Sequence, residues 1–199
     1  MTNNPAHIVT DRARLSYVHL FAPYAGPAGG DAKYSTTVLV PKSDAATKQR
    51  VDAAIEAAKQ AGKSKCWSGI IPPVLAISVY DGDQPRPSDG MPFGEECRGC
   101  WVINASSKQA PQVVDIQCNP IIDQTQVYSG MYGRVSLTFF PYNANGKKGI
   151  GCGLNNVQKL DDGEPLGGRT SAADDFGQPP AYMQQAAQQP VDPFAGLSL

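Results

Sequence analysis

The chain has 199 residues, of which 41% are hydrophobic and only 18% are charged. This length suits one compact domain with room for a tail. No apolar run reaches the length of about 18 residues that a transmembrane helix needs, and residues 1–10 lack the pattern of a secretory signal. We therefore expect a cytoplasmic protein, and five cysteines, an odd number, fit a reducing compartment better than a disulfide framework.

The two charge signs are divided between the body of the chain and its end. Residues 1–160 hold sixteen Lys and Arg against twelve Asp and Glu, whereas residues 161–199 hold one Arg against six acids. A basic body with an acidic tail indicates a protein that binds a polyanion. A solvated surface with an ordinary terminus is the alternative.

The first half of the chain predicts two strands and one helix. Residues 13–22 (ARLSYVHLFA) and 33–40 (KYSTTVLV) alternate and are rich in strand formers, and a Pro/Gly loop at 23–30 separates them. A helix follows, with Ser43 or Asp44 as its N-cap and Gly62 as its stop. The helix has one apolar face, formed by Val51, Ala54, Ile55 and Ala58.

The second half predicts further strands joined by turns. Shorter strands are expected at 74–80, 98–106 and 112–116, with a long loop at 81–94. The strongest pattern is 126–142 (QVYSGMYGRVSLTFFPY), which an Asn145-Gly146 turn joins to a last strand at 149–160. One helix among about six strands predicts a mainly β fold, a small and mostly antiparallel barrel.

The end of the chain has a different composition. Residues 172–199 are rich in Gln, Ala and Pro and offer little to bury, so we expect them to be mostly disordered. This divides the chain into a folded domain at 1–168 and a flexible acidic, Gln-rich tail at 169–199.

Strand 126–142 carries the most informative side chains. One face holds Val127, Met131, Val135, Leu137 and Phe139 and is expected to face the core. The other face, where polar residues are usual, is aromatic and cationic. Bases stack on aromatic rings and phosphates meet Arg or Lys, so this face predicts a site for single-stranded nucleic acid, unless the rings pack under loops or against the helix. Its members are Tyr128, Tyr132, Arg134, Phe140 and Tyr142.

Basic residues lie at strand ends and in loops, where phosphate contacts and plain solvation are both possible. Lys147 and Lys148 follow the turn after the aromatic strand. The others are Lys33, Lys42, Arg86, Arg98 and Lys108. Gly149, Gly151 and Gly153 leave one face of the last strand without side chains, which predicts a sharp bend or a close backbone approach.

Signs of a metal or of catalysis are weak. Cys97 and Cys100 have the spacing of zinc ligands, but a second ligand pair is missing, and Cys118 with Cys66 or Cys152 could complete a site only through the fold. No P-loop, G-x-S-x-G or H-E-x-x-H motif occurs. Three aspartates, Asp81, Asp83 and Asp89, lie in a Pro/Gly loop and are typical of turns. We expect no cofactor and no catalysis.

Several stretches resemble the tailed-phage single-stranded DNA-binding proteins, a family long catalogued as a domain of unknown function. The resemblance runs from about residue 13 to residue 176, and its most specific part is the G-x-x-CGLNNVQK-like block at 149–159. That block lies within the matching stretch 147–168, and the other stretches are 14–22, 33–44, 101–108 and 128–135.

The resemblance implies an OB-fold with an inserted helix that coats single-stranded DNA in phage replication and recombination in the host cytoplasm. It also implies an acidic tail at 161–199 that folds back over the DNA groove and contacts replication or recombination proteins. The tail's acidic and aromatic residues are Asp174, Asp175, Phe176, Asp192 and Phe194. In this chain the tail is sparse in acids and ends in Leu199 instead of an aromatic residue.

The leading hypothesis is a sequence-independent, non-enzymatic protein that binds single-stranded DNA, as a monomer or homodimer and without a membrane. A phage structural or adaptor protein whose aromatic strand face binds a protein partner is the alternative. A zinc-stabilised module or a metal nuclease is a third. Steep weakening of binding by salt would distinguish DNA from an apolar protein partner.

Overall fold

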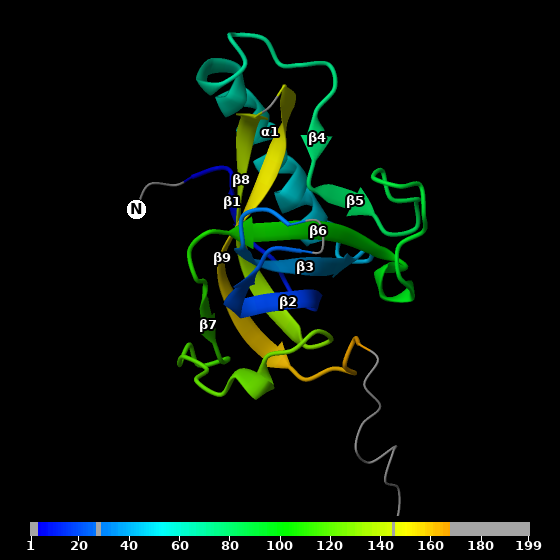
Figure 1. Cartoon of the computed structure of the whole chain (residues 1–199), viewed down its shortest axis with the longest axis vertical. Coiled ribbons are helices and arrows are strands. Elements are labelled where there is room, and N and C mark those ends of the chain that lie inside the picture. Colours follow the sequence, from blue (N-terminus) through cyan, green and yellow to red (C-terminus); the bar gives the residue numbers. More distant parts are fainter. Residues whose placement is uncertain (1–3, 27–28, 145, 168–199) are drawn as a thin grey trace, which may run out of the picture. The chain divides into compact units, whose positions relative to one another are not determined.

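The computed structural model describes residues 4–26, 29–144 and 146–167 (Figure 1). Within these residues there are nine strands, one α-helix and two short 3₁₀ helices, at 95–97 and 124–126. The longer elements are β2 (Ala13–Tyr24), β3 (Lys33–Pro41), α1 (Ala45–Lys65), β6 (Cys100–Ser107), β8 (Tyr132–Ala144) and β9 (Lys147–Asp161). The short strands are β1 (His7–Val9), β4 (Ala76–Ile77), β5 (Val79–Asp81) and β7 (Gln112–Val114).

Five strands close into a ring in the order β2, β3, β6, β9, β8. Neighbours in the ring are antiparallel except β6 and β9, which run parallel and meet at Ser106 and Gly153. A closed barrel of five strands is the architecture of the OB-fold. The predicted mainly β, OB-fold-like barrel with an inserted helix is therefore confirmed, and α1 enters the chain between β3 and β6 and packs against β8 (Figure 1).

The alternation along β8 builds the core as predicted, but the strand starts later. Val135, Leu137 and Phe139 are buried, whereas Arg134 and Phe140 on the other face are exposed. The predicted strand from residue 126 was wrong at its beginning, because residues 124–126 form a 3₁₀ turn and Gly130 adopts a φ of +117°. A positive φ of this size is incompatible with a regular strand.

Helix α1 begins as predicted and ends later. The side chain of Asp44 caps it by accepting a 2.9 Å hydrogen bond from the amide of Thr47, and the predicted apolar face is buried. Gly62 does not stop the helix but lies within its last turn. A Cβ there would stand 2.6 Å from the ring of Trp67 and 2.7 Å from Pro141, so the glycine permits close packing at this point.

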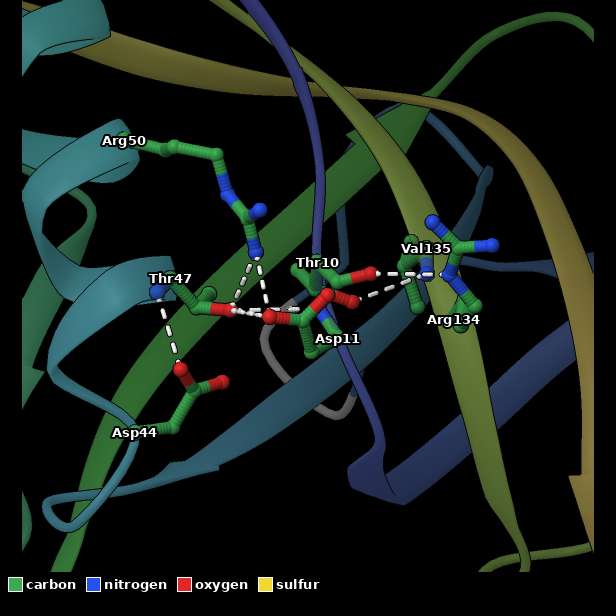
Figure 2. A network of polar contacts seen from close by, with 7 residues as sticks. All are labelled: Thr10, Asp11, Asp44, Thr47, Arg50, Arg134 and Val135. Atoms are coloured by element: carbon green, nitrogen blue, oxygen red, sulfur yellow. Dashed lines mark hydrogen bonds and ion pairs between the residues drawn. The ribbon is translucent and has the colours of Figure 1, made fainter.

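A polar network ties the start of α1 to the barrel (Figure 2). The amide of Asp11 donates to Thr47 Oγ1 at 3.1 Å, and Arg50 forms a 2.7 Å ion pair with Asp11. One residue earlier, Thr10 exchanges hydrogen bonds with Val135: the Val135 amide donates to Thr10 Oγ1, and the Thr10 amide donates to the Val135 carbonyl, each at 3.0 Å. The helix is thus held against the strand that carries much of the core.

Several other boundaries differ from the prediction for local reasons. The strand expected at 74–80 is divided at Ser78, because β4 pairs with β9 whereas β5 pairs with β6. The strand expected from residue 98 starts at Cys100, since Gly99 has a φ of +66°. The three-residue β1 was not predicted. None of the helices formed by residues 4–26, 29–144 and 146–167 has the length and apolarity to span a membrane.

Candidate nucleic-acid interface

The outer face of β3 and β6 is a polar floor. Thr37 is in register with Asn104, and Ser35 with Ser106, and all four side chains line one hollow. Thr37 Oγ1 donates a 2.9 Å hydrogen bond to Asn104 Oδ1. The intervening residues of both strands point into the core. The strands therefore present hydroxyl and amide groups outward while their apolar residues hold the barrel together.

Tyr17 of β2 stands at one side of this floor. A bulge interrupts the pairing of β2 with β3 between Ser16 and His19, and Tyr17 has a φ of +49° and is 66% exposed. Such a conformation is unfavourable for a residue with a side chain, and bulges often redirect side chains at functional sites. The ring borders two adjoining hollows, which share Thr37 and Asn104.

A loop at residues 82–99 forms the opposite side. Lys42 holds its base through ion pairs with Asp81 at 2.5 Å and Asp83 at 2.6 Å, and these contacts lower the pKa of both carboxyl groups. Cys97 and Phe93 pack over the outward side chains of β3 and β6. Lys42, a predicted DNA contact, thus already has two carboxylate partners and anchors the loop.

Arg86 brings a positive charge from this loop to the floor. It lines the same hollows as Phe93 and Asn104, and Tyr80 of β5 borders one of them. Its guanidinium forms a 2.9 Å ion pair with Asp89, while its buried Nε has no hydrogen-bond partner among the described residues. An arginine beside aromatic rings matches what a nucleic-acid backbone and bases require.

The β8–β9 hairpin adds two of the predicted aromatic residues. Phe140 is 45% exposed and lies over Gly151, where a Cβ would stand 2.6 Å from its ring. Tyr142 lies over Gly149 in the same way. The predicted close backbone approach occurs at Gly149, where a Cβ would collide with the Ala76 carbonyl oxygen, whereas at Gly151 the glycine makes room for a side chain, the ring of Phe140. Burial first, and the Tyr142 phenol second, raise the pKa of Tyr80, which borders the hollow beside Arg86.

The remaining lysines of the predicted set lie in two places, at the start of β9 and beside the end of the polar floor. Lys147 and Lys148 are exposed at the start of β9. Lys33 begins β3 and Lys108 follows β6, next to the end of the polar floor at Ser35 and Ser106. Lys108 forms a 2.6 Å ion pair with the exposed Asp31.

The other predicted aromatic residues lie at the far end of β8. The Tyr128 hydroxyl donates toward two acceptors, Asp162 Oδ1 and the Gly163 carbonyl oxygen, each at 3.0 Å. The guanidinium of Arg12 lies 3.5 Å from the ring centre of Tyr132. Arg134 donates to the Thr10 carbonyl at 3.2 Å (Figure 2). The structure therefore separates Tyr128, Tyr132 and Arg134 from Phe140 and Tyr142, and the first three are engaged in hydrogen bonds or a cation–π contact within the protein.

The remaining predicted sites give little further chemistry. Cys97 and Cys100 belong to the small apolar cluster under loop 82–99, where burial raises the pKa of Cys97 to about 11. Residues 4–26, 29–144 and 146–167 contain no group of three or more His, Cys, Asp or Glu side chains placed to hold a metal ion. The tail residues Asp174, Asp175, Phe176, Asp192 and Phe194 lie outside the described residues.

Sequence reasoning missed four residues that border the floor: Tyr17, Tyr80, Phe93 and Asn104. Tyr17 follows Ala13 and Leu15 at steps of two residues, and both of these are buried. Simple alternation therefore predicts that Tyr17 points inward. Phe93 lies in a loop with no periodic pattern. Only Asn104 had a signal, a polar side chain between buried apolar neighbours in a strand.

Comparison with known proteins identifies the family. Residues 6–188 match the family model described as Enterobacter phage Enc34, ssDNA-binding protein. The p50 protein of Acyrthosiphon pisum secondary endosymbiont phage 1 is 29% identical over 176 residues, covering 85% of this chain and 91% of p50.

Solved structures agree with the family match. The single-stranded DNA-binding protein from bacteriophage Enc34, in complex with ssDNA, is 30% identical and superimposes with a TM-score of 0.68 over 81% of this chain and 90% of that chain. The single-stranded DNA-binding protein gp2.5 of bacteriophage T7 is 14% identical, with a TM-score of 0.54 over 83% and 97%, and shows the shared fold. The chain belongs to the Enc34-type family of phage single-stranded DNA-binding proteins.

Proposed function

We propose that this protein binds single-stranded DNA along the outer face of β3 and β6. The observation that carries the proposal is the polar floor of these strands, bordered by Tyr17 on one side and by Phe93 and Arg86 on the other. In OB-folds the second and third barrel strands, with the loops that join strands one to two and four to five, bind oligonucleotides. Here those strands are β3 and β6, and the fourth-to-fifth connection is the β8–β9 hairpin.

Each part of this surface suits one part of the ligand. Tyr17, Phe93, Phe140 and Tyr142 offer rings on which bases can stack, and stacking contributes about 1–3 kcal/mol per base. Arg86 lies beside the rings of Tyr80 and Phe93, where it can meet a phosphate. We assign further phosphate contacts to the basic residues at strand ends, Lys33, Lys108, Lys147 and Lys148. Neither stacking nor phosphate contact depends on base identity, which supports binding to any sequence.

The relatives support the same ligand and a biological setting. The Enc34 protein, 30% identical, is described in complex with ssDNA. We infer that this protein coats and protects single-stranded DNA during phage replication and recombination in the host cytoplasm, without catalysis. We also propose that the tail residues Asp174, Asp175, Phe176, Asp192 and Phe194 contact replication or recombination proteins.

The binding test is a fluorescence anisotropy titration of a labelled oligo-dT at low and high salt. We expect affinity to fall with salt with a log–log slope of about −0.7 for each phosphate neutralised. The Tyr17→Ala, Phe140→Ala double variant should bind about tenfold more weakly or worse, because two stacking surfaces are lost. Absence of binding at low salt would refute DNA binding, and salt-insensitive capture of a phage protein would favour the adaptor function.

A matched variant tests the rest of the predicted set. Tyr132→Leu removes a ring that Arg12 and the segment after β9 already contact. We expect it to change DNA affinity less than Phe140→Ala, although both rings belong to the same face of β8. A larger loss in Tyr132→Leu, in a protein that remains folded, would place the binding surface at the far end of β8.

A further inference from the structure

The outward face of β3 and β6 continues past the polar floor to the ends of these strands. Lys33 lies two residues before Ser35 on β3, and side chains alternate along a strand, so Lys33 shares the outward face. Lys108 lies two residues after Ser106, just beyond the end of β6. The two lysines therefore follow the last pair of the floor, Ser35 and Ser106, by about 7 Å along the strands.

Two aromatic rings of β2 lie on the same outward face. His19 is in register with Ser35, and Tyr24 is in register with Lys33, and residues directly opposite each other in a sheet share a face. The two ring centres are 4.5 Å apart and the ring planes differ by 13°, so the rings are stacked. Tyr24 is nevertheless 50% exposed. Its ring is thus held by His19 while half of the residue remains open to solvent.

A tyrosine held in this way suits the stacking of a base. Because His19 already restrains the ring, less side-chain freedom is lost when a base packs on Tyr24. Proteins that bind single-stranded nucleic acid without sequence preference combine such rings with cations that contact the backbone. Lys33, directly opposite Tyr24, supplies a cation of this kind.

Asp31 holds the second lysine at this end of the face. Lys108 Nζ lies 2.6 Å from Asp31 Oδ2, and both side chains are exposed. The hydrogen bond and the charge of Lys108 lower the pKa of Asp31, and the charge of Lys33 lowers it further. Exposed ion pairs contribute little to stability, so a phosphate can displace Asp31 from Lys108 at small cost.

These observations extend the surface available to DNA. Resting on the DNA groove proposed above, we propose that single-stranded DNA continues beyond the polar floor, with a base stacked on Tyr24 and phosphates bound by Lys33 and Lys108. Asp31 competes with the DNA for Lys108 and thereby weakens binding.

Anisotropy titration of labelled oligo-dT tests the stacking contact. Tyr24→Ala should weaken binding about fivefold or more, because one stacking surface is lost. Tyr34→Ala is the matched control: Tyr34 is the neighbour of Lys33, and alternation places its ring on the opposite face of β3, so this variant should bind as the wild type does. Thermal melting checks that both variants are folded.

A gain of affinity tests the competing carboxylate. Asp31→Asn releases Lys108 and should strengthen binding at low salt by up to about fivefold, the worth of an exposed ion pair, and the gain should shrink at high salt. Asp52→Asn removes the same charge from an exposed 2.6 Å pair with Lys48 in α1 and should change affinity less. Equal gains in both variants would reflect net charge alone and would refute the competition at Lys108.

The outcomes separate this extension from the groove itself. If folded Tyr24→Ala binds oligo-dT as tightly as the wild type does, DNA does not stack at this end of the face and the extension is refuted. A loss of affinity in the Tyr17→Ala, Phe140→Ala double variant would then still support the groove. If the wild-type protein does not bind oligo-dT at low salt, the groove is refuted as well.

Discussion

The ring of Phe140 packs directly over Gly151, so a substitution at Gly151 tests whether this ring contributes to DNA binding. A Cβ at position 151 would lie 2.6 Å from Cζ and 2.8 Å from Cε2 of Phe140. Carbon atoms in contact prefer about 3.5–4.0 Å, so Gly151→Ala must push the ring aside by about 1 Å or more. The ring can turn away because it is 45% exposed, and we expect the protein to stay folded.

The displaced ring should weaken DNA binding almost as much as its removal. Loss of one stacked base is worth about 1–3 kcal/mol, so oligo-dT affinity should fall about five- to 150-fold in Phe140→Ala and by a comparable factor in Gly151→Ala. Anisotropy titrations would measure both, with thermal melting as a check on folding. In the Phe140→Ala background the added methyl meets no ring, and Gly151→Ala should then cost nothing further.

Two results of these titrations would refute the role of the Phe140 ring in DNA binding. Gly153→Ala is the control for the ring, because its Cβ would lie 3.7 Å from the Phe140 ring, an ordinary contact distance, and 3.3 Å from the Thr138 carbonyl oxygen. If Gly151→Ala binds as the wild type does, Phe140 does not stack on DNA. If Gly151→Ala weakens binding equally with and without the Phe140 ring, the methyl acts on the backbone, and the reasoning about the ring is wrong.

Three further predictions concern stability and reactivity. Gly62→Ala should lower the free energy of unfolding by about 1–3 kcal/mol in urea titrations, because its methyl would collide with Trp67, although glycine-to-alanine changes normally stabilise helices. In the folded protein a thiol reagent should label the exposed Cys118 at once and Cys97, with its raised pKa of about 11, only on unfolding; equal rates would contradict its burial. Asp81 and Asp83, which pair with Lys42, have lowered pKa values, so their ion pairs stabilise the fold above the ordinary carboxyl pKa of about 4. This stabilisation is lost as the pH falls through the lowered values. Because Lys42→Met removes both pairs, the free energy of unfolding of this variant should fall less between pH 7 and pH 3 than that of the wild type.

Most of the fold could be predicted from the alternation of apolar and polar residues along the strands. Wherever a strand has one buried face, as β8 does from Val135 to Phe139, the period of two identifies both the strand and its inward side. The helix was predictable from Asp44 and from its apolar stripe. Its end was not, because Gly62 serves a tertiary contact with Trp67 that no local pattern contains.

The site was only partly predictable, for the same physical reason. Arg134 and Phe140 of β8 point outward as predicted, but Tyr128 lies before the strand and packs against the core. No local signal shows that the segment after β9 returns to contact Tyr128 and Tyr132. Tyr17 depends on a bulge that reverses its expected direction. Phe93 depends on a loop held by Lys42. Contacts between distant segments therefore select which of the chain's aromatic residues border the groove.

Photocross-linking locates the DNA most directly. An oligo-dT carrying iododeoxyuridine would be bound to the full chain at low salt and irradiated, and the modified peptides identified by mass spectrometry. We predict cross-links to the groove aromatics, Tyr17 and Phe93 on the β3–β6 face and Phe140 on the hairpin, which are lost when excess unlabelled oligo-dT competes. Cross-links confined to Tyr128 or Tyr132, with the groove aromatics unmodified in the bound complex, would contradict the account.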